Sequence, residues 1–386
     1  MIPRIAKDAL LRIAKTYPVA ALTGPRQSGK TTLSRSLFPE KPYVNLEDIE
    51  QSRFANEDPK GFLGQFPRGA IIDEAQRAPA IFSQIQLIVD EAKAMGHFLL
   101  TGSQQFGLLS GITQSLAGRV GLLQLLPFSL KELQVAKLAP TSIEQLLFQG
   151  FYPPIYDRGV EPTSWYGNYV RTYIERDVRN LIQIKDLAAF QTFVRLCAGR
   201  TGQLVNLSSL GADAGVTHNT AREWLSILEA SYIIFFLRPH FNNFNKRLVK
   251  APKLYFYDVG LAAWLLGIQA PEQLVMHPSR GALFESFVIS ELMKASYNKE
   301  RDPHLYFWRD YSGNEIDVVI DNAGQLTPIE IKSGKTLNSD FFESLNFFKA
   351  IAGEKASRPQ LIYGGDTRQE RSGVDVWSWR DFATLG

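Results

Sequence analysis

Eight residues near the start of the chain have the types and spacing of a phosphate-binding loop. The segment Gly24-Pro25-Arg26-Gln27-Ser28-Gly29-Lys30-Thr31 matches the pattern G-x-x-x-x-G-K-[ST]. A glycine-rich turn exposes successive backbone N–H groups to phosphate oxygens, and the helix that follows adds its positive N-terminal end. We expect Lys30 to reach the β- and γ-phosphates and Thr31 to ligate Mg²⁺. The pattern therefore predicts a site for a nucleoside triphosphate and its magnesium ion.

Polar side chains also follow two later apolar runs. Asp73 and Glu74 come directly after Ala70 to Ile72. We expect Asp73 to hold Mg²⁺ through water and Glu74 to orient or polarise the attacking water; the alternative is a solvated strand end. The run that starts at Phe98 ends in three candidates for sensing the γ-phosphate or the water, namely Thr101, Ser103 and Gln104.

Short apolar runs separated by helical stretches position these groups. The runs are Val19 to Leu22, Tyr43 to Asn45, Ala70 to Asp73, His97 to Thr101 and Val120 to Leu126. Their alternation with helices predicts an α/β domain with a parallel sheet over residues 1–140. Ligands of such sheets bind beyond the carboxyl ends of the strands, where the polar residues fall here.

Composition excludes several other classes of protein. The chain has 386 residues, which predicts two or three domains. The single cysteine, Cys197, and five scattered histidines argue against a disulfide framework and a zinc cluster, and Cys197 is expected in the core. The net charge is only +3. No apolar run approaches the roughly 20 residues of a membrane span, and charged residues interrupt the N-terminus. We expect a cytoplasmic protein without a membrane partner.

The first domain resembles the AAA+ ATPases, which are P-loop NTPases, and in particular a bacterial and archaeal branch with a C-terminal domain of unknown function. The resembling stretches are Ala21 to Thr32, Ile72 to Gln76, Leu100 to Gln104, Leu116 to Arg119 and Leu126 to Ser129. The resemblance implies ATP as the nucleotide, and Gly24, Pro25, Arg26, Gln27, Ser28, Gly29, Lys30, Thr31 and Thr32 as contacts.

The same resemblance makes Arg119 a candidate arginine finger that reaches the γ-phosphate of a neighbouring subunit, in a homo-oligomer. A fixed cation at that place is worth several orders of magnitude in rate. The alternative is that Arg119 pairs with a surface carboxylate.

Residues 141–274 are predicted to form a helical and winged-helix domain. Leu207 to Ala214 and His218 to Ala230 have helical patterns around a break at Gly215 to Thr217, which is typical of a helix-turn-helix. Strands are expected at Ile233 to Leu237 and Leu254 to Tyr257. From 195 to 253 the balance of charge is +5, which favours contact with nucleic-acid phosphates. The candidate DNA contacts are His218, Asn219, Thr220, Arg222, Lys246, Arg247, Lys250 and Lys253.

Two alternatives stay open for this middle segment. Winged helices also serve as lids of AAA+ proteins and as protein docking modules. The charged stretch Tyr169 to Arg179 resembles a recurrent stretch of the same family. Its charges predict a salt-bridged exposed helix face, and Arg176 or Arg179 contacting the nucleotide is the alternative.

Residues 275–386 resemble the restriction-endonuclease-like core in their predicted order αβββαβ. The helix is expected at Gly281 to Tyr297, and four residues would form the motif: Glu285, Asp317, Glu330 and Lys332. Glu330 and Lys332 face the same side of a strand because side chains alternate. The carboxylates are a possible second Mg²⁺ site, and Lys332 would orient a water or stabilise charge instead of acting as a ligand.

Together these features favour an ATPase that couples hydrolysis to DNA binding or remodelling. One alternative is an ATP-dependent nuclease that uses Glu285, Asp317, Glu330 and Lys332. Another is a docking or signalling protein in which ATP sets a conformation and DNA plays no part.

Overall fold

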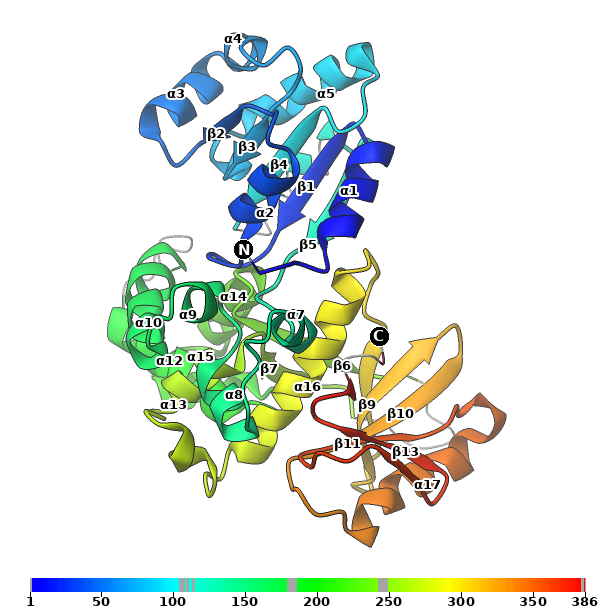
Figure 1. Cartoon of the computed structure of the whole chain (residues 1–386). Coiled ribbons are helices and arrows are strands. Elements are labelled where there is room, and N and C mark those ends of the chain that lie inside the picture. Colours follow the sequence, from blue (N-terminus) through cyan, green and yellow to red (C-terminus); the bar gives the residue numbers. More distant parts are fainter. Residues whose placement is uncertain are drawn as a thin grey trace. The chain divides into compact units, whose positions relative to one another are not determined.

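A computed structural model describes residues 2–103, 108, 111–112, 115–178, 186–241, 249–382 and 385, with the backbone alone for 175–178. The chain divides into two compact units (Figure 1). Unit 1 comprises Met1–Phe128, Ala230–Tyr232 and Ser296–Arg301, and unit 2 comprises Ser129–Glu229, Ile233–Ala295 and Asp302–Gly386. The three-domain division at residues 140 and 274 stays a prediction.

Unit 1 is built on a five-stranded sheet with the order β2-β3-β4-β1-β5. Every pair of neighbouring strands is parallel, as the alternation of apolar runs and helices predicts. The strands are β1 Val19–Thr23, β2 Tyr43–Asn45, β3 Ile71–Asp73, β4 Phe98–Gly102 and β5 Val120–Gln124. The phosphate loop, Gly24 to Thr31, and the carboxylates after β3 therefore lie at the same edge of the sheet.

Helices cover both faces of this sheet. They are α1 Lys7–Thr16, α2 Lys30–Leu37, α3 Ile49–Glu57, α4 Pro59–Gly64, η1 Ala75–Arg77 and α5 Ala80–Ala92. Ala20 and Leu22 of β1 pack in one cluster with α1 and α2, whereas Val19 and Ala21 pack in the other with α4 and α5. This alternation is the two-residue period of a strand buried on both faces.

Unit 2 begins with a helical region. Its elements are α7 Leu130–Val135, α8 Ile143–Gln149, α9 Pro153–Asp157, α10 Pro162–Tyr169, the π-helix η2 Val170–Val178, α12 Leu187–Gly199, α13 Leu207–Ala214, α14 His218–Ala230, α15 Val259–Leu265, η3 Pro271–Leu274 and α16 Arg280–Tyr297. The two helices predicted for the helix-turn-helix have the predicted bounds. Gly215 ends α13 in the left-handed conformation, and the hydroxyl of Thr217 accepts the N–H of Thr220 at 3.1 Å at the start of α14.

An eight-stranded sheet completes unit 2, with the order β12-β13-β11-β10-β9-β8-β6-β7. Its strands are β6 Ile234–Pro239, β7 Lys253–Phe256, β8 Leu305–Arg309, β9 Glu315–Asn322, β10 Gln325–Lys332, β11 Gln360–Tyr363, β12 Gln369–Arg371 and β13 Val374–Ser378, with η4 Ser339–Phe342, α17 Glu343–Ala352 and η5 Gly353–Lys355. The elements from α16 to β11 follow the predicted order αβββαβ. The expected wing strands β6 and β7 form an antiparallel pair, and β6 extends the C-terminal sheet by pairing with β8.

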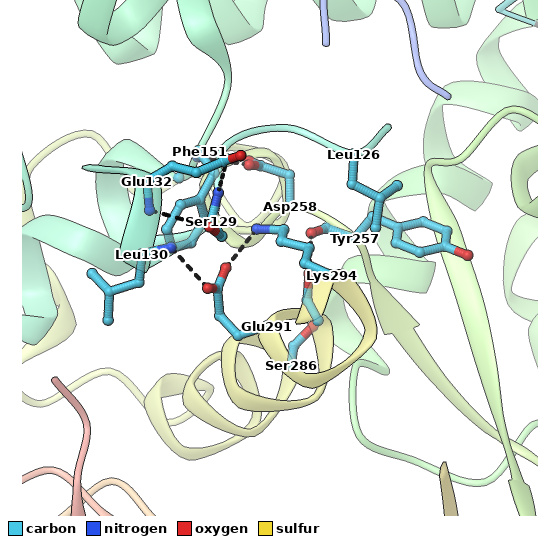
Figure 2. A network of polar contacts seen from close by, with 12 residues as sticks. Leu126, Ser129, Leu130, Glu132, Phe151, Tyr257, Asp258, Ser286, Glu291 and Lys294 are labelled. Atoms are coloured by element: carbon cyan, nitrogen blue, oxygen red, sulfur yellow. Dashed lines mark hydrogen bonds and ion pairs between the residues drawn. The ribbon is translucent and has the colours of Figure 1, made fainter. Parts of the chain in front are cut away.

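A buried polar network surrounds α16 in unit 2. The side chains of Glu291 and Lys294 are 1% and 2% exposed and form an ion pair of 2.7 Å. Glu291 also accepts the N–H of Leu130 at 2.8 Å (Figure 2). The Lys294 ammonium lies 3.8 Å from the ring centroid of Phe151. These contacts fix the start of α7 against α16. Among the described residues, no helix is long and apolar enough to cross a bilayer.

Candidate functional site

The phosphate loop joins β1 to α2 through two glycines in unusual conformations. Gly24 has φ +147°, and a Cβ atom there would lie 2.1 Å from the carbonyl oxygen of Leu125. Gly29 has φ +94° and precedes the first residue of α2. Only glycine adopts these positive φ angles without strain, and only glycine lacks the Cβ atom that would clash at position 24. The loop therefore turns tightly between the sheet and the N-terminus of α2.

Lys30 lies buried along the inside of this loop. Its Nζ donates to the carbonyl oxygens of Gly24 at 2.9 Å and Pro25 at 2.8 Å. Burial lowers the pKa of Lys30 to about 8, against the opposing effect of the Glu74 and Asp73 carboxylates. The ammonium group is thus held by neutral carbonyls, which a more strongly attracting phosphate can replace.

Asp73 collects four hydrogen bonds at the end of β3. Its Oδ2 accepts the hydroxyls of Thr31 at 2.7 Å and Tyr43 at 2.8 Å. Its Oδ1 accepts the hydroxyl of Thr101 and the N–H of Glu74, the latter at 3.2 Å. Burial, together with the hydrogen bond to Asp73, raises the pKa of the Tyr43 phenol. The predicted metal-holding pair, Thr31 and Asp73, is therefore in direct contact.

Glu74 is held beside Asp73 by polar groups from two other segments. Its backbone is left-handed, with φ +54°. Its Oε2 accepts Gln76 Nε2 at 2.5 Å, the hydroxyl of Ser103 at 2.9 Å and the N–H of Ser103 at 3.4 Å. This fixed carboxylate has the geometry of a group that orients a water. Thr101 and Ser103 are thus brought to the site as predicted, and Gln104 lies outside the described residues.

The residues present fit a triphosphate with its magnesium ion. The two glycines of the turn have no side chain to cover the backbone N–H groups of the loop, and the hydroxyl of Ser28 is buried without a hydrogen-bond partner. A hydroxyl and a carboxylate, from Thr31 and Asp73, are the oxygen donors that Mg²⁺ prefers. Of the other predicted contacts, Pro25 is buried, Gln27 and Thr32 are exposed, and Arg26 forms an ion pair of 2.9 Å with Glu47.

Arg119 is paired with a carboxylate inside its own unit. Its Nε and Nη2 donate to the two oxygens of Asp90 on α5, at 2.6 and 2.9 Å. Arg119 directly precedes β5, and its carbonyl accepts the N–H of Val19 at the start of β1. The five residues of β1 separate this end from the phosphate loop, a span of about 15 Å. Arg119 therefore lies at the edge of the sheet opposite the loop of its own chain.

The predicted C-terminal motif residues form a cluster in unit 2. Lys332 lies 2.5 Å from Oε1 of Glu330 and 4.0 Å from Oδ2 of Asp317. Burial and the charge of Asp317 raise the pKa of Glu285 to about 7 and that of Glu330 to about 8. The alternating side chains of β10 thus bring Glu330 and Lys332 to one face, where Glu285 of α16 and Asp317 of β9 join them.

Lys253 belongs to this cluster and not to an exposed DNA-contacting surface. Its side chain is 5% exposed and lies 3.2 Å from Glu285, and it forms a second ion pair with Glu315. Tyr255 donates to the same oxygen of Glu285 at 2.5 Å. The local charge count could not show that one of the eight basic residues is buried. Lys253 is therefore removed from the candidate DNA contacts.

Lysines thus occupy the positions between these carboxylates. In the part of the chain that the structure describes, no group of three or more His, Cys, Asp or Glu side chains is arranged to hold a metal ion. The second magnesium site at Glu285, Asp317 and Glu330 stays a prediction.

The other candidate DNA contacts differ in how exposed their side chains are. His218, Asn219 and Arg222 of α14 are exposed, Thr220 is half-buried, and Lys250 is exposed. Lys246, Arg247 and Arg179 lie outside the described residues, as does the side chain of Arg176. Cys197 is buried, as expected.

Sequence reasoning missed three residues that touch the nucleotide site. They are Tyr43 on Asp73, Gln76 on Glu74, and Arg4, which donates to the carbonyl oxygen of Ser28 at 2.6 Å. Gln76 lies two residues after Glu74, within the stretch Ile72 to Gln76, so its short spacing was a usable signal. Tyr43 and Arg4 reach the site through the fold, and no local pattern marks them.

Comparisons with known proteins give family matches to three segments of the chain. Family models match an AAA domain over residues 16–134, a domain of unknown function (DUF8612) over 140–272 and a second one (DUF4143) over 280–382. Two uncharacterized proteins, Mb2031c of Mycobacterium bovis and Rv2008c of Mycobacterium tuberculosis, are each 30% identical over 370 residues, which cover 94% of this chain and 80% of theirs. The chain belongs to the same family as these two mycobacterial proteins. This AAA-domain family resembles P-loop ATPases, and its first domain implies nucleotide binding.

Two solved structures are distantly similar to this chain. The Walker-type ATPase paby2304 of Pyrococcus abyssi has a TM-score of 0.46 and 15% identity, covering 69% of this chain and 96% of its own. AMPPCP-bound DnaA from Aquifex aeolicus has a TM-score of 0.30 and 16% identity, covering 58% of this chain and 86% of its own. Neither likeness bears on what this chain does.

Proposed function

We propose that this protein binds ATP with Mg²⁺ and hydrolyses it at the edge of the unit 1 sheet. The observation that supports this most is the contact between Thr31 of α2 and Asp73 of β3, because it brings together a hydroxyl and a carboxylate that are 42 residues apart in the sequence. The buried ammonium of Lys30 donates to carbonyl oxygens of the phosphate loop beside this contact.

Each residue has a distinct role in this proposal. Lys30 exchanges its two carbonyl partners for phosphate oxygens, and the backbone N–H groups of the loop bind the phosphates. Thr31 and Asp73 would hold Mg²⁺, which neutralises charge that develops on the phosphates. Glu74, oriented by Gln76 and Ser103, positions the attacking water.

Phosphate release by wild type and by Thr31→Val tests this function. The substitution keeps the shape of the side chain and removes the hydroxyl. We expect Mg²⁺-dependent hydrolysis in wild type and its loss in Thr31→Val. Thr16→Val, at the exposed end of α1, is the matched control and should keep wild-type activity. The proposal fails if wild type releases no phosphate, or if Thr31→Val and wild type are equally active.

We further propose that hydrolysis is coupled to DNA binding or remodelling through α14. The support is the exposed row of His218, Asn219 and Arg222 on a helix-turn-helix. ATPase rates with single-stranded, duplex and branched DNA test this coupling, with Arg222→Ala as the variant and the exposed Arg53→Ala of unit 1 as control. If DNA neither binds nor changes the rate, the docking or signalling function is favoured instead.

A nuclease is the second candidate function, because four motif residues meet in unit 2. In it, Glu285, Asp317, Glu330 and Lys332 would form a second active site, with Mg²⁺ as cofactor. Plasmid, linear and branched DNA are incubated with Mg²⁺ and either wild type or Asp317→Ala. Cleavage by wild type that Asp317→Ala lacks supports the nuclease, and intact DNA in both samples rejects it.

A further inference from the structure

Tyr43 lies on the edge strand of the unit 1 sheet and contacts Asp73, one of the two residues that would hold the metal ion. It begins β2, where its Cα pairs with that of Ile71 on β3. Its hydroxyl extends two residues further along β3 and donates to Oδ2 of Asp73 at 2.8 Å. Tyr43 precedes Asp73 by 30 residues in the sequence, so no local pattern links the two, yet its hydroxyl contacts the carboxylate directly.

A second contact holds the ring of Tyr43. The guanidinium of Arg35 lies 4.8 Å from the ring centroid, which is a cation–π distance. Arg35 is on α2, the helix that carries Lys30 and Thr31. The Tyr43 side chain, and with it the hydroxyl, is therefore held by a contact from the same helix that would bind the nucleotide.

Asp73 Oδ2 accepts hydrogen bonds from two hydroxyls. A hydroxyl oxygen has one hydrogen to donate and two lone pairs, so Thr31 can ligate a metal ion while it still donates to Oδ2. The Tyr43 hydroxyl is the second donor, and it holds Oδ2 from a residue that would not ligate the metal. A hydrogen bond to a carboxylate is charge-assisted and stronger than one between neutral groups.

We propose that Tyr43 is a positioning residue that fixes the orientation of Asp73 when the magnesium–nucleotide complex binds. This inference rests on the proposed ATPase function. It assigns Tyr43 no contact with the nucleotide or with the reacting atoms, so its effect must pass through Asp73 and the metal.

The test is Tyr43→Phe in the full chain, which removes the hydroxyl and keeps the ring against Arg35. ATP hydrolysis is measured against Mg²⁺ concentration, and ATP binding is measured in excess chelator. We expect the Mg²⁺ concentration at half-maximal rate to rise roughly tenfold, from loss of one hydrogen bond to a charged group, with metal-free ATP affinity unchanged. Tyr17→Phe is the matched control in the same unit and should behave as wild type.

The outcomes separate this inference from the function on which it rests. If wild type neither binds nor hydrolyses ATP, the ATPase function fails. If wild type is active and Tyr43→Phe has an unchanged Mg²⁺ dependence, the role of Tyr43 is rejected. An equal loss of ATP affinity with and without Mg²⁺ also rejects it, because a general distortion of unit 1 would act on both.

Discussion

The hydroxyl of Thr31 donates to Oδ2 of Asp73 across 2.7 Å and so links the first turn of α2 to the end of β3. Helix α2 follows β1, and Asp73 ends β3; in the parallel sheet these two strands are separated by β4, and their carboxyl ends lie at the same edge. Because hydroxyl groups already orient the Asp73 carboxylate, Thr31 and Asp73 are in position before any ligand binds. This lowers the free-energy cost of binding.

Replacing Glu74 should separate binding from hydrolysis. In Glu74→Gln the amide keeps the size of the side chain and loses the charge that polarises a water. We expect ATP affinity within about threefold of wild type and a turnover lower by about 10²- to 10⁴-fold. Calorimetry and phosphate release measure the two quantities, with Glu50→Gln on exposed α3 as control. Equal turnover in Glu74→Gln and wild type would remove Glu74 from this role.

ATP affinity should fall as the pH rises above about 8. Burial lowers the pKa of Lys30 to about 8, although Glu74 and Asp73 oppose this effect. The free protein then loses the ammonium charge that a triphosphate attracts, and affinity falls by up to about tenfold per pH unit. The unfolded chain keeps that proton up to 10.5, so the free energy of unfolding without nucleotide should rise with pH over the same range.

Fluorescent-nucleotide titrations at several pH values check this dependence. Lys60→Ala, an exposed lysine in unit 1, should keep the wild-type profile. An affinity that stays constant across the range would show that Lys30 remains charged throughout.

Arg119 should act only in an assembly of subunits, because it lies at the far edge of its own sheet. We expect Arg119→Ala to lower turnover by roughly 10³-fold or more if it is a finger. Mixing Arg119→Ala with Lys30→Ala should restore activity, since the second variant supplies an intact Arg119 to the first. Asp90→Ala releases Arg119 and should keep turnover.

Phosphate release by the separate and mixed variants provides the measurement. Wild-type turnover in Arg119→Ala would leave Arg119 with only its ion pair to Asp90.

Breaking the buried ion pair of α16 should destabilise unit 2. Glu291→Ala leaves the Lys294 ammonium buried without its carboxylate, which costs about 3 to 5 kcal/mol of unfolding free energy. Replacing both residues, by Leu and Met, should cost less because neither member of the pair is left as an unpaired buried charge. Denaturant unfolding of the single and double variants measures this. If the single and double variants lose the same free energy of unfolding, the unpaired Lys294 charge is not the cause of the loss.

Local sequence patterns predicted most of the strands and the phosphate loop of unit 1. The spacing from Gly24 to Thr31 and the apolar runs before Asp73 and Thr101 indicate strands and a loop, because burial on both faces leaves a continuous apolar stretch. The bounds of α13 and α14 were also predictable from Thr217 and Gly215, whose chemistry is that of a cap.

Contacts between distant segments were not predictable. The basic composition around Lys253 predicts a solvated surface, but the strand pairing of β7 buries this lysine against Glu285. The pairing of β6 with β8 joins segments that a pattern of short strands assigns to separate domains. Both depend on register across the sheet, for which a single sequence carries no local signal.

Calorimetric titration of Mg²⁺–ATP into the folded full chain tests the central claim most directly. Wild type should bind the nucleotide saturably, Lys30→Ala should show no binding, and Lys60→Ala should bind as wild type does. The account is contradicted if folded wild type gives no heat of binding with any nucleoside triphosphate, or if Lys30→Ala binds as tightly as wild type.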